Sequence, residues 1–281
     1  MSIRDITAVI ASFKSGEIIK SCLNSINREC KVILVENSND LDFKRKIEQE
    51  FSNVECILSG NNLGYGKANN IGLKKVTSKY ALILNPDTTL QPDSIENFFK
   101  AIKRVPKFSI MAPLIQEKKE EATKINRIDN NPISVKNVKG FAMFLNISEF
   151  QQIGFFDENF FFYFEEIDLC KRLINHQKKI YLESSIIINH TGGKSHDNAL
   201  NKIMELSRNW HWMWSTFYYH KKHKGFFISF LIILPKLISA AFKVLLYSLF
   251  LNRDKKEIYN HRLLGLVNAI MGKDSWYRPK V

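Results

Sequence analysis

The chain has 281 residues, enough for one large domain or for one domain with an appendage, and its 45% of apolar residues can bury a sizeable core. The four cysteines (Cys22, Cys30, Cys56 and Cys170) form no C-x-x-C pair, which argues against a zinc finger and favours reduced thiols in a cytosolic protein. The net charge of +13 is uneven, because the residues from Arg208 onward hold 13 of the 41 Lys+Arg and only 3 of the 28 Asp+Glu.

Short apolar runs alternate with amphipathic stretches over the first hundred residues. The N-terminal apolar stretch Ile6–Phe13 is too short for a signal peptide, and Ile6–Ala11 within it is predicted to be a buried strand. Further strands are expected at Val32–Val35, Val54–Leu58 and Tyr80–Leu84, and helices at Glu17–Asn27, Phe43–Phe51, in the second part of Asn62–Lys75, and at Pro92–Arg104 with Pro92 at the first helical position. This alternation predicts a mostly parallel α/β sheet with helices flanking both faces.

Less regular patterns follow in the second half of the chain. The polar, aperiodic stretch Glu117–Asn137 is predicted to be a loop or an insertion. Strands are expected at Val138–Asn146, Lys179–Leu182 and Ile186–Asn189, and helices at Glu165–Asn175 and Asp197–His220. The composition changes near Arg208, which predicts a first domain of residues 1–207 and a basic, apolar helical region of residues 208–281.

A polar turn comes directly after the predicted strand Tyr80–Leu84. It reads Asn85-Pro86-Asp87, and ligands of open α/β sheets bind beyond the carboxyl ends of the strands. The carboxylate of Asp87 could therefore hold Mg²⁺ or Mn²⁺, which prefer oxygen ligands. The alternative is an ordinary turn, in which all three residue types are common.

Two loops are candidates for binding a nucleotide. Val35–Asp40 ends the second predicted strand, and its polar side chains could hydrogen-bond a base and a ribose. Asn61–Asn70 contains two glycines that permit close backbone approach to a ligand, and the helix N-terminus that follows favours anions. A polar connection and a helix-capping loop are the alternatives for these two segments.

Three carboxylates open a predicted helix at Glu165, Glu166 and Asp168. The helix dipole favours acids there, which is reason enough for their presence. However, the aromatic run Phe160–Phe164 precedes them and could desolvate a carboxylate, raising its pKa toward that of a useful base. His190 ends the last predicted strand and could be a metal ligand or a proton shuttle, although a lone histidine is usually neither.

In this order and context, the segments resemble the family 2 glycosyltransferases with the GT-A fold, and most closely their bacterial rhamnosyltransferase-like branch, which builds surface polysaccharides. The resemblance extends over about residues 5–220. The segments that carry it are Ala11-Ser12-Phe13, Val35–Asp40, Asn62–Asn70, the D-x-D-like Leu84-Asn85-Pro86-Asp87, and Gly154–Glu158 with Phe161–Arg172.

The resemblance implies an enzyme that transfers a sugar, with inversion, from a nucleotide-sugar donor (dTDP-rhamnose or a UDP-sugar) to a glycan or polyprenyl-linked acceptor. Asp87 and His190 would bind the Mg²⁺ or Mn²⁺ ion that bridges the donor diphosphate. Glu166 would be the general base, positioned by Glu165 and Asp168. The residues implied to hold the nucleotide sugar are Ser12, Glu36, Asn37, Asp40, Asn62, Gly64, Gly66, Lys67, Asn70 and Arg208.

The chain departs from the family pattern at two places. The family commonly has Asp where Glu36 stands, and Glu-Asp where Glu165-Glu166 stands; the extra methylene moves a carboxylate oxygen by roughly an ångström, which can matter for catalysis. Two other functions stay open, a catalytically inactive nucleotide-sugar-binding relative and a sugar nucleotidyltransferase. The single glycine of Ala11–Gly16 counts against the second, which would be expected to carry a glycine-rich phosphate loop there.

The basic C-terminal region needs an anionic partner, and its long apolar run fits a membrane surface better than nucleic acid. Phe226–Leu251 is long enough to span a bilayer. However, Lys236 and Lys243 lie inside it and both flanks are basic, so we expect an in-plane helix bent at Pro235. This predicts a cytoplasmic enzyme peripheral to the inner face of the cell membrane; a buried helix, a dimer contact and a true span are the alternatives.

Overall fold

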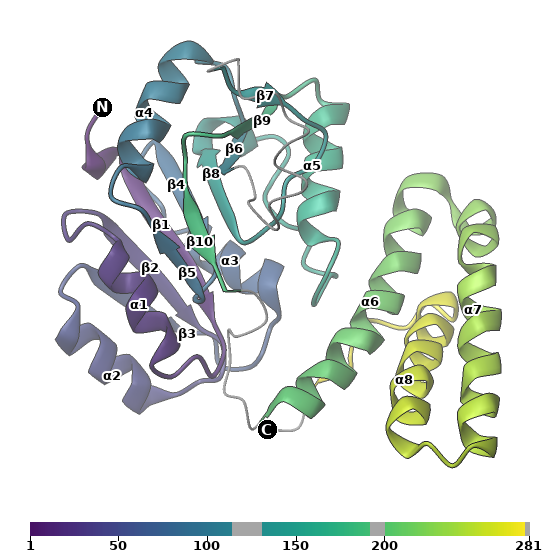
Figure 1. The fold of residues 1–281 in the computed structure, drawn as a ribbon. Coiled ribbons are helices and arrows are strands. Elements are labelled where there is room, and N and C mark those ends of the chain that lie inside the picture. The colour runs from purple at the N-terminus through teal and green to yellow at the C-terminus, as the bar shows by residue number, and fades with distance from the viewer. Residues whose placement is uncertain (114–130, 192–199, 279–281) are drawn as a thin grey trace. The chain divides into compact units, whose positions relative to one another are not determined.

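The computed structural model describes residues 1–113, 131–191 and 200–278, and the chain forms two compact units (Figure 1). The first unit contains Met1–Leu63, Ala68–Phe156 and the segment from Leu169. The second contains Gly64–Lys67, Asp157–Asp168 and the C-terminal helices. The predicted limits of the catalytic domain, residues 1–207, stay a prediction.

An eight-stranded sheet forms the centre of the first unit, in the order β3-β2-β1-β4-β8-β6-β9-β7. Its first half is parallel, as the sequence predicts, and consists of β3 (Val54–Leu58), β2 (Lys31–Glu36), β1 (Ile6–Ser12) and β4 (Tyr80–Leu84). These strands are nearly continuous apolar runs because both faces of the sheet are covered.

The second half of the sheet is mixed. Strand β8 (Ala142–Asn146) runs antiparallel to both β4 and β6 (Ile110–Pro113), a pairing that the sequence did not predict. Strand β9 (Ile180–Glu183) is parallel to β6, and β7 (Ile133–Ser134) is antiparallel to β9. A separate two-stranded sheet joins β5 (Thr88–Leu90) to β10 (Ile188–His190).

Helices cover both faces of the sheet in the first unit. Helices α1 (Ile18–Ser25), α2 (Leu41–Glu50) and α4 (Ser94–Arg104) are drawn beside the sheet in Figure 1. Their side chains share one core with Ala8 and Ile10 of β1. On the opposite face, α3 (Tyr65–Leu73) packs Ala68 against β2, and Gly72 lies so close to β1 that a Cβ there would be 2.5 Å from Val9. Helix α5 (Glu165–Asn175) follows, and short 3₁₀ helices occupy Ile3–Asp5 and Ile147–Phe150.

Some local predictions differ from the structure. Helix α4 begins at Ser94 with Asp93 as its N-cap, so Pro92 precedes the helix and does not start it. Part of the predicted loop Glu117–Asn137 lies outside the described residues, and its residues 133–134 form β7. The four cysteines are buried free thiols, as predicted, and burial raises the pKa of Cys22 to about 12.

Three helices make up most of the second unit: α6 (Asn201–Lys224), α7 (Phe226–Leu249) and α8 (Arg253–Ile270). Trp210, Trp214 and Phe217 of α6 pack with Ile233 of α7 and Leu266 of α8 in one apolar core. A Cβ on Gly265 would be 2.3 Å from the carbonyl oxygen of Trp210, so this glycine permits α6 and α8 to cross closely. The predicted helix Asp197–His220 corresponds to α6, except for residues 197–199, which lie outside the described residues.

Candidate active site

Asp87 and His190 meet because two distant segments pair. In the β5–β10 ladder Thr88 stands opposite His190, and Thr191 donates two hydrogen bonds to the carbonyl oxygen of Asp87, one from its backbone nitrogen (3.2 Å) and one from Oγ1 (3.0 Å). As a result, Nε2 of His190 lies 3.4 Å from Oδ1 of Asp87. The ring of Phe141 stacks on the imidazole at 4.7 Å and fixes its plane. The two predicted metal ligands are therefore neighbours.

These two residues fit a divalent cation. The Asp87 side chain is only 1% exposed, and its Oδ1 has no hydrogen-bond partner among the described residues. A buried carboxylate oxygen without a partner is unusual unless an ion or water supplies one. In the described part of the chain, no group of three or more His, Cys, Asp or Glu side chains is placed to hold a metal ion. Mg²⁺ is typically bound in this way, by one or two protein ligands together with phosphate oxygens and water.

The carboxylate of Glu36 organises the loop that follows β2. It accepts hydrogen bonds from the backbone nitrogen of Ser38 (2.9 Å), the hydroxyl of Ser38 (2.6 Å) and the backbone nitrogen of Asp40 (2.9 Å). Asp40 in turn caps α2 by accepting from the backbone nitrogen of Phe43. The structure thus gives these two predicted nucleotide-binding residues a clear role in shaping their own loop.

Asn37 joins that loop to the predicted Asn62–Asn70 loop. Its amide nitrogen donates to Oδ1 of Asn62 (3.1 Å), and its amide oxygen accepts from the backbone nitrogen of Leu63 (2.9 Å). Its own backbone nitrogen donates to the carbonyl oxygen of Ser12 (2.7 Å), whose hydroxyl donates to Ser15. Hydrogen bonds therefore bring together five of the residues predicted to hold the nucleotide, beyond the carboxyl ends of β1, β2 and β3: Ser12, Glu36, Asn37, Asp40 and Asn62.

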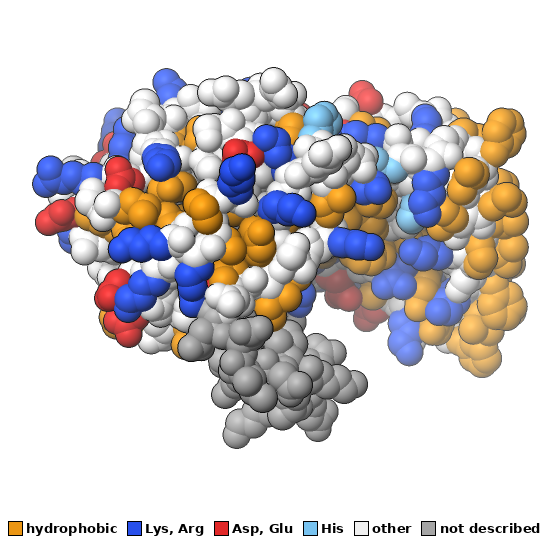
Figure 2. All heavy atoms as spheres, turned by 90° about the horizontal axis from the view of Figure 1, so that it is seen from above, with side chains coloured by type: hydrophobic (Ala, Val, Ile, Leu, Met, Phe, Trp, Pro, Cys, Tyr) orange, Lys and Arg blue, Asp and Glu red, His pale blue; other side chains and the backbone are white. Residues whose placement is uncertain are grey.

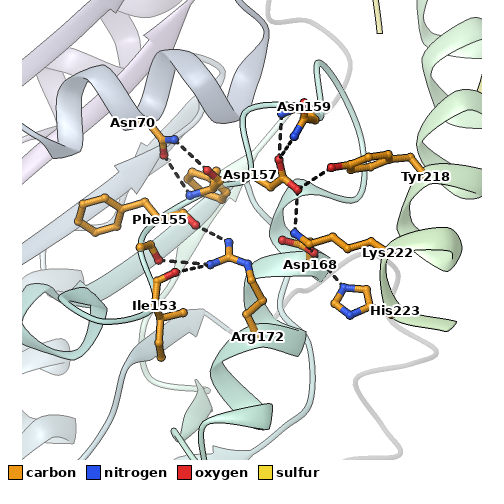
Figure 3. A network of polar contacts seen from close by, with 12 residues as sticks. Asn70, Ile153, Phe155, Asp157, Asn159, Asp168, Arg172, Tyr218, Lys222 and His223 are labelled. Atoms are coloured by element: carbon orange, nitrogen blue, oxygen red, sulfur yellow. Dashed lines mark hydrogen bonds and ion pairs between the residues drawn. The ribbon is translucent and has the colours of Figure 1, made fainter. Parts of the chain in front are cut away.

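The side chain of Asn70 forms hydrogen bonds with the protein backbone. Both ends of its amide bond the backbone of Phe156, at 2.9 Å from Nδ2 to the carbonyl oxygen and 3.0 Å from the backbone nitrogen to Oδ1 (Figure 3). Arg172 holds the same turn by donating to the carbonyl oxygens of Ile153 and Phe155. Arg172 was not singled out from the sequence as a site residue. These contacts fix the segment that leads to residue 157.

In the second unit, Gly64 makes a close backbone contact. Its φ is +82°, and a Cβ at this position would lie 2.2 Å from the carbonyl oxygen of Phe161. The same oxygen accepts a hydrogen bond from the backbone nitrogen of Tyr65 at 3.0 Å. Buried Gly66 follows in α3, and Lys67 forms an ion pair of 3.6 Å with Glu158. Glycine is thus required at position 64 by both backbone conformation and space.

Glu165 and Glu166 begin α5 with poorly solvated carboxylates. In each of them Oε2 is buried and has no hydrogen-bond partner among the described residues. Burial, with the neighbouring charge of Glu166, raises the pKa of Glu165 well above its ordinary value, and burial raises the pKa of Glu166 as well. The two preceding residues, Tyr163 (φ +69°) and Phe164 (φ +71°), both adopt the left-handed conformation that side chains disfavour. This is the environment expected for a carboxylate that takes up a proton.

Asp168 lies in an ionic network that the sequence did not reveal. Its fully buried carboxylate accepts from Nζ of Lys222 (2.7 Å) and contacts Nε2 of His223 (2.9 Å), both on α6 (Figure 3). Lys222 and Tyr218 also bond Asp157; burial alone would raise the pKa of that carboxyl, but hydrogen bonds from Lys222 and Asn159 outweigh it and lower the pKa. In the sequence, Lys222 is simply one of the basic residues that precede the predicted membrane-binding helix Phe226–Leu251.

Arg208, the last of the predicted donor-binding residues, lies half-buried on α6. Burial raises the pKa of Tyr163, and the positive charge of Arg208 opposes this rise. Arg208 therefore acts electrostatically on the aromatic segment that precedes Glu165.

Comparison with known proteins identifies the family. Residues 7–170 match the model of "Glycosyl transferase family 2". The chain belongs to glycosyl transferase family 2. The predicted family and the predicted class of enzyme, a glycosyltransferase, are thereby confirmed.

Two relatives in sequence and one solved structure are similar to the chain. The chain is 27% identical over 190 residues to the low-salt glycan biosynthesis hexosyltransferase Agl10 of Haloferax volcanii, covering 60% of this chain and 61% of that protein. It is 23% identical over 251 residues to the N-acetylglucosaminyl-diphospho-decaprenol L-rhamnosyltransferase of Mycobacterium tuberculosis, covering 72% and 81%. The mannosyltransferase PcManGT of Pyrobaculum calidifontis, solved with GDP-Man and Mn²⁺, superimposes with a TM-score of 0.56 at 11% identity, covering 96% of this chain and 88% of that one.

The solved structure supports the fold alone, and it confirms the predicted GT-A-type sheet with flanking helices and a C-terminal helical region. The match to the family model ends at residue 170, soon after Asp168. His190, Arg208, Lys222 and His223 therefore lie beyond the family match.

Proposed function

We propose that this chain of glycosyl transferase family 2 is a metal-dependent, inverting glycosyltransferase. The observation that carries the proposal is the pair of Asp87 and His190, 3.4 Å apart, with a buried carboxylate oxygen that has no hydrogen-bond partner among the described residues. In this proposal Asp87 and His190 hold Mg²⁺ or Mn²⁺. The bound ion supplies positive charge that offsets the charge developing on the leaving diphosphate.

Glu166 is the proposed general base. The acceptor hydroxyl loses its proton to the Glu166 carboxylate as its oxygen attacks the anomeric carbon, and the bond to the diphosphate oxygen breaks. A single displacement of this kind inverts the anomeric centre, whereas a double displacement would need a nucleophilic carboxylate as well. The raised pKa of Glu166 brings its basicity closer to that useful near neutral pH. Glu165 and Asp168, which stand in the same first turn of α5, are the residues proposed to position it.

The proposed donor is dTDP-rhamnose or a UDP-sugar, and the proposed acceptor is a glycan or a polyprenyl-linked glycan of surface polysaccharide synthesis. The support is the relative whose name describes rhamnosyl transfer to a diphospho-decaprenol-linked sugar. In the chain itself, the loops ordered by Glu36 and Asn37 form a polar surface at the carboxyl ends of β1 and β2, where a base and a ribose would be expected.

We further propose that α7 binds the inner face of the cell membrane, which would keep this cytoplasmic enzyme near a lipid-linked acceptor. Within the described residues, α7 is the one helix long and apolar enough to cross a membrane, with a mean hydropathy of 2.0 and only 17% of its apolar window buried. Exposed Phe227, Leu231, Phe242 and Leu245 repeat at helical spacing along one face. Figure 2 shows the hydrophobic side chains of this helix gathered beside Lys and Arg side chains.

Contacts with α8 favour an in-plane helix over a span. Nζ of Lys243 donates to the hydroxyl of Tyr259 on α8 (3.2 Å), and the ring of Tyr247 stacks on Tyr259 at 5.5 Å. Lys243 thus faces away from the exposed apolar side. If α7 spanned the membrane, it would either have to separate from α8 or draw α8 into the bilayer with it. The charged residues of α8, among them Arg253 and Lys256, would then each cost about 2.5–3.5 kcal/mol near the bilayer centre.

The decisive experiment is a panel of nucleotide sugars tested for metal-dependent hydrolysis and for thermal stabilisation. One donor should be hydrolysed with Mg²⁺ or Mn²⁺ and not with EDTA, and Asp87→Ala should abolish this. An inactive relative would be stabilised by a donor without hydrolysing it, and a nucleotidyltransferase would release diphosphate from a nucleoside triphosphate and a sugar phosphate. Carbonate should release the protein from membranes if α7 lies in-plane; resistance to carbonate would support a span.

A further inference from the structure

Lys222 bridges the two ends of the segment Asp157–Asp168, which contains Glu165 and Glu166. Its Nζ lies 2.7 Å from Oδ2 of Asp157 and 2.7 Å from Oδ1 of Asp168, the first and last residues of that segment (Figure 3). A single ammonium group therefore joins both ends of the segment to α6. His223 contacts Asp168 from the next position along the helix.

The segment between these two aspartates is held in a strained conformation. Tyr163 and Phe164 adopt left-handed φ values in succession, immediately before Glu165. Such conformations persist only where the surrounding structure over-determines them, and they concentrate at functional sites. Helix α6 supplies the restraint at a third point, because the hydroxyl of Ser215 donates to the carbonyl oxygen of Phe162 at 2.8 Å.

The bridge that Lys222 forms between Asp157 and Asp168 depends on its charge as well as on the length of its side chain. The side chain of Asp168 is fully buried and that of Asp157 is 12% exposed, so both carboxylates are largely removed from water. Lys222 is the cation that both carboxylates share, and its loss would leave two poorly solvated carboxylates near each other without that shared charge. Tyr218 donates to Asp157, but as a neutral hydroxyl it cannot balance this charge.

We propose that Lys222 is a positioning residue for the general base: by bridging Asp157 to Asp168 it holds the segment in the strained conformation that presents the Glu166 carboxylate. The inference rests on the proposed role of Glu166 as that base. In this role Lys222 acts through the segment and need not touch donor or acceptor. It should therefore affect the rate of the chemical step more than donor binding.

The test compares Lys222→Met with Lys222→Arg and with a matched control, Lys202→Met. Lys202 is also a lysine of α6 bridging two carboxylates, Asp254 (2.9 Å) and Glu257 (3.5 Å), but its side chain is 65% exposed. We expect kcat of Lys222→Met to fall on the order of 10²-fold, as for a misplaced catalytic group, with the KM for the donor little changed. Lys222→Arg, which keeps the charge, should recover most of kcat, and Lys202→Met should match the unmodified chain.

Hydrogen exchange of the folded protein provides a readout that does not depend on activity. Backbone amides of residues 157–168 should exchange faster in Lys222→Met than in Lys202→Met. Unchanged exchange in this segment, or a kcat within roughly threefold of the original, would overturn the proposal. If Lys222→Met does not fold, Lys222→Gln with the same two readouts decides the matter. High turnover in Glu166→Gln would instead remove the proposed base, while the exchange result would still decide whether Lys222 restrains the segment.

Discussion

Replacement of Gly64 by alanine should separate the two reasons for a glycine at this position. Gly64 has a φ of +82°, and an added Cβ would lie 2.2 Å from the carbonyl oxygen of Phe161. Gly60 provides a matched control, because its φ is +81° and no atom lies within 4 Å of an added Cβ. The variant Gly60→Ala therefore measures the cost of the left-handed conformation alone, and Gly64→Ala adds the steric clash.

The expected magnitudes follow from these contacts. Gly60→Ala should cost about 1–2 kcal/mol of unfolding free energy for the left-handed conformation. In Gly64→Ala the backbone of Phe161 must also shift, at a cost of about 1–3 kcal/mol for overpacking. Loss of the hydrogen bond from the backbone nitrogen of Tyr65 to the same oxygen adds about 0.5–1.5 kcal/mol.

Thermal unfolding of the two variants checks this reasoning. The extra cost of about 2–4 kcal/mol should lower the melting temperature of Gly64→Ala by on the order of 5–10 °C relative to Gly60→Ala. Because Gly64 belongs to the proposed donor loop, the KM for the donor should also rise in Gly64→Ala and not in Gly60→Ala. Equal melting temperatures for the two variants would refute the close contact between Gly64 and Phe161.

Three further predictions concern the proposed chemistry. Glu166→Gln should lower kcat by roughly 10²–10⁴-fold while donor binding, measured by calorimetry, persists; a loss of only a few-fold would move the base to Glu165 or Asp168. The acidic limb of the pH profile of kcat/KM should lie above the ordinary glutamate pKa of 4.5, because burial raises the pKa of Glu166; a limb at or below 4.5 would contradict this assignment. NMR of the first-formed product should show the anomeric configuration opposite to that of the donor, and retention would reject a single displacement.

The sequence predicted the parallel half of the sheet well because its signals are local. Val54–Leu58 and Tyr80–Leu84 are strands with the predicted limits, and α5 spans the predicted Glu165–Asn175. The antiparallel placement of β8 and the short strand β5 were missed, since a pairing between distant segments leaves no periodicity in either one. Helix α8 was expected only as part of a C-terminal helical region, because its apolar residues are interspersed with charges.

The candidate site was predictable in its residue types and less so in its contacts. Asp87 and His190 were chosen from a motif and a resemblance, but their separation of 3.4 Å depends on the pairing of β5 with β10, about a hundred residues apart in the chain. The resemblance likewise pointed to Glu166. It could not point to Lys222, because a lysine in a basic stretch looks the same in sequence whether it faces lipid or two buried carboxylates.

The buried pair of Glu165 and Glu166 links the stability of the protein to its proposed activity. Both carboxyls have folded-state pKa values raised above their ordinary value of 4.5. As the pH rises above 4.5, the unfolded chain releases these protons before the folded chain does, so the free energy of unfolding falls through this window. In the same window Glu166 becomes able to accept a proton. Conditions that create the base therefore also strain the segment that carries it. The ionic contacts of Lys222 on α6 with Asp157 and Asp168 stabilise the segment where that strain develops.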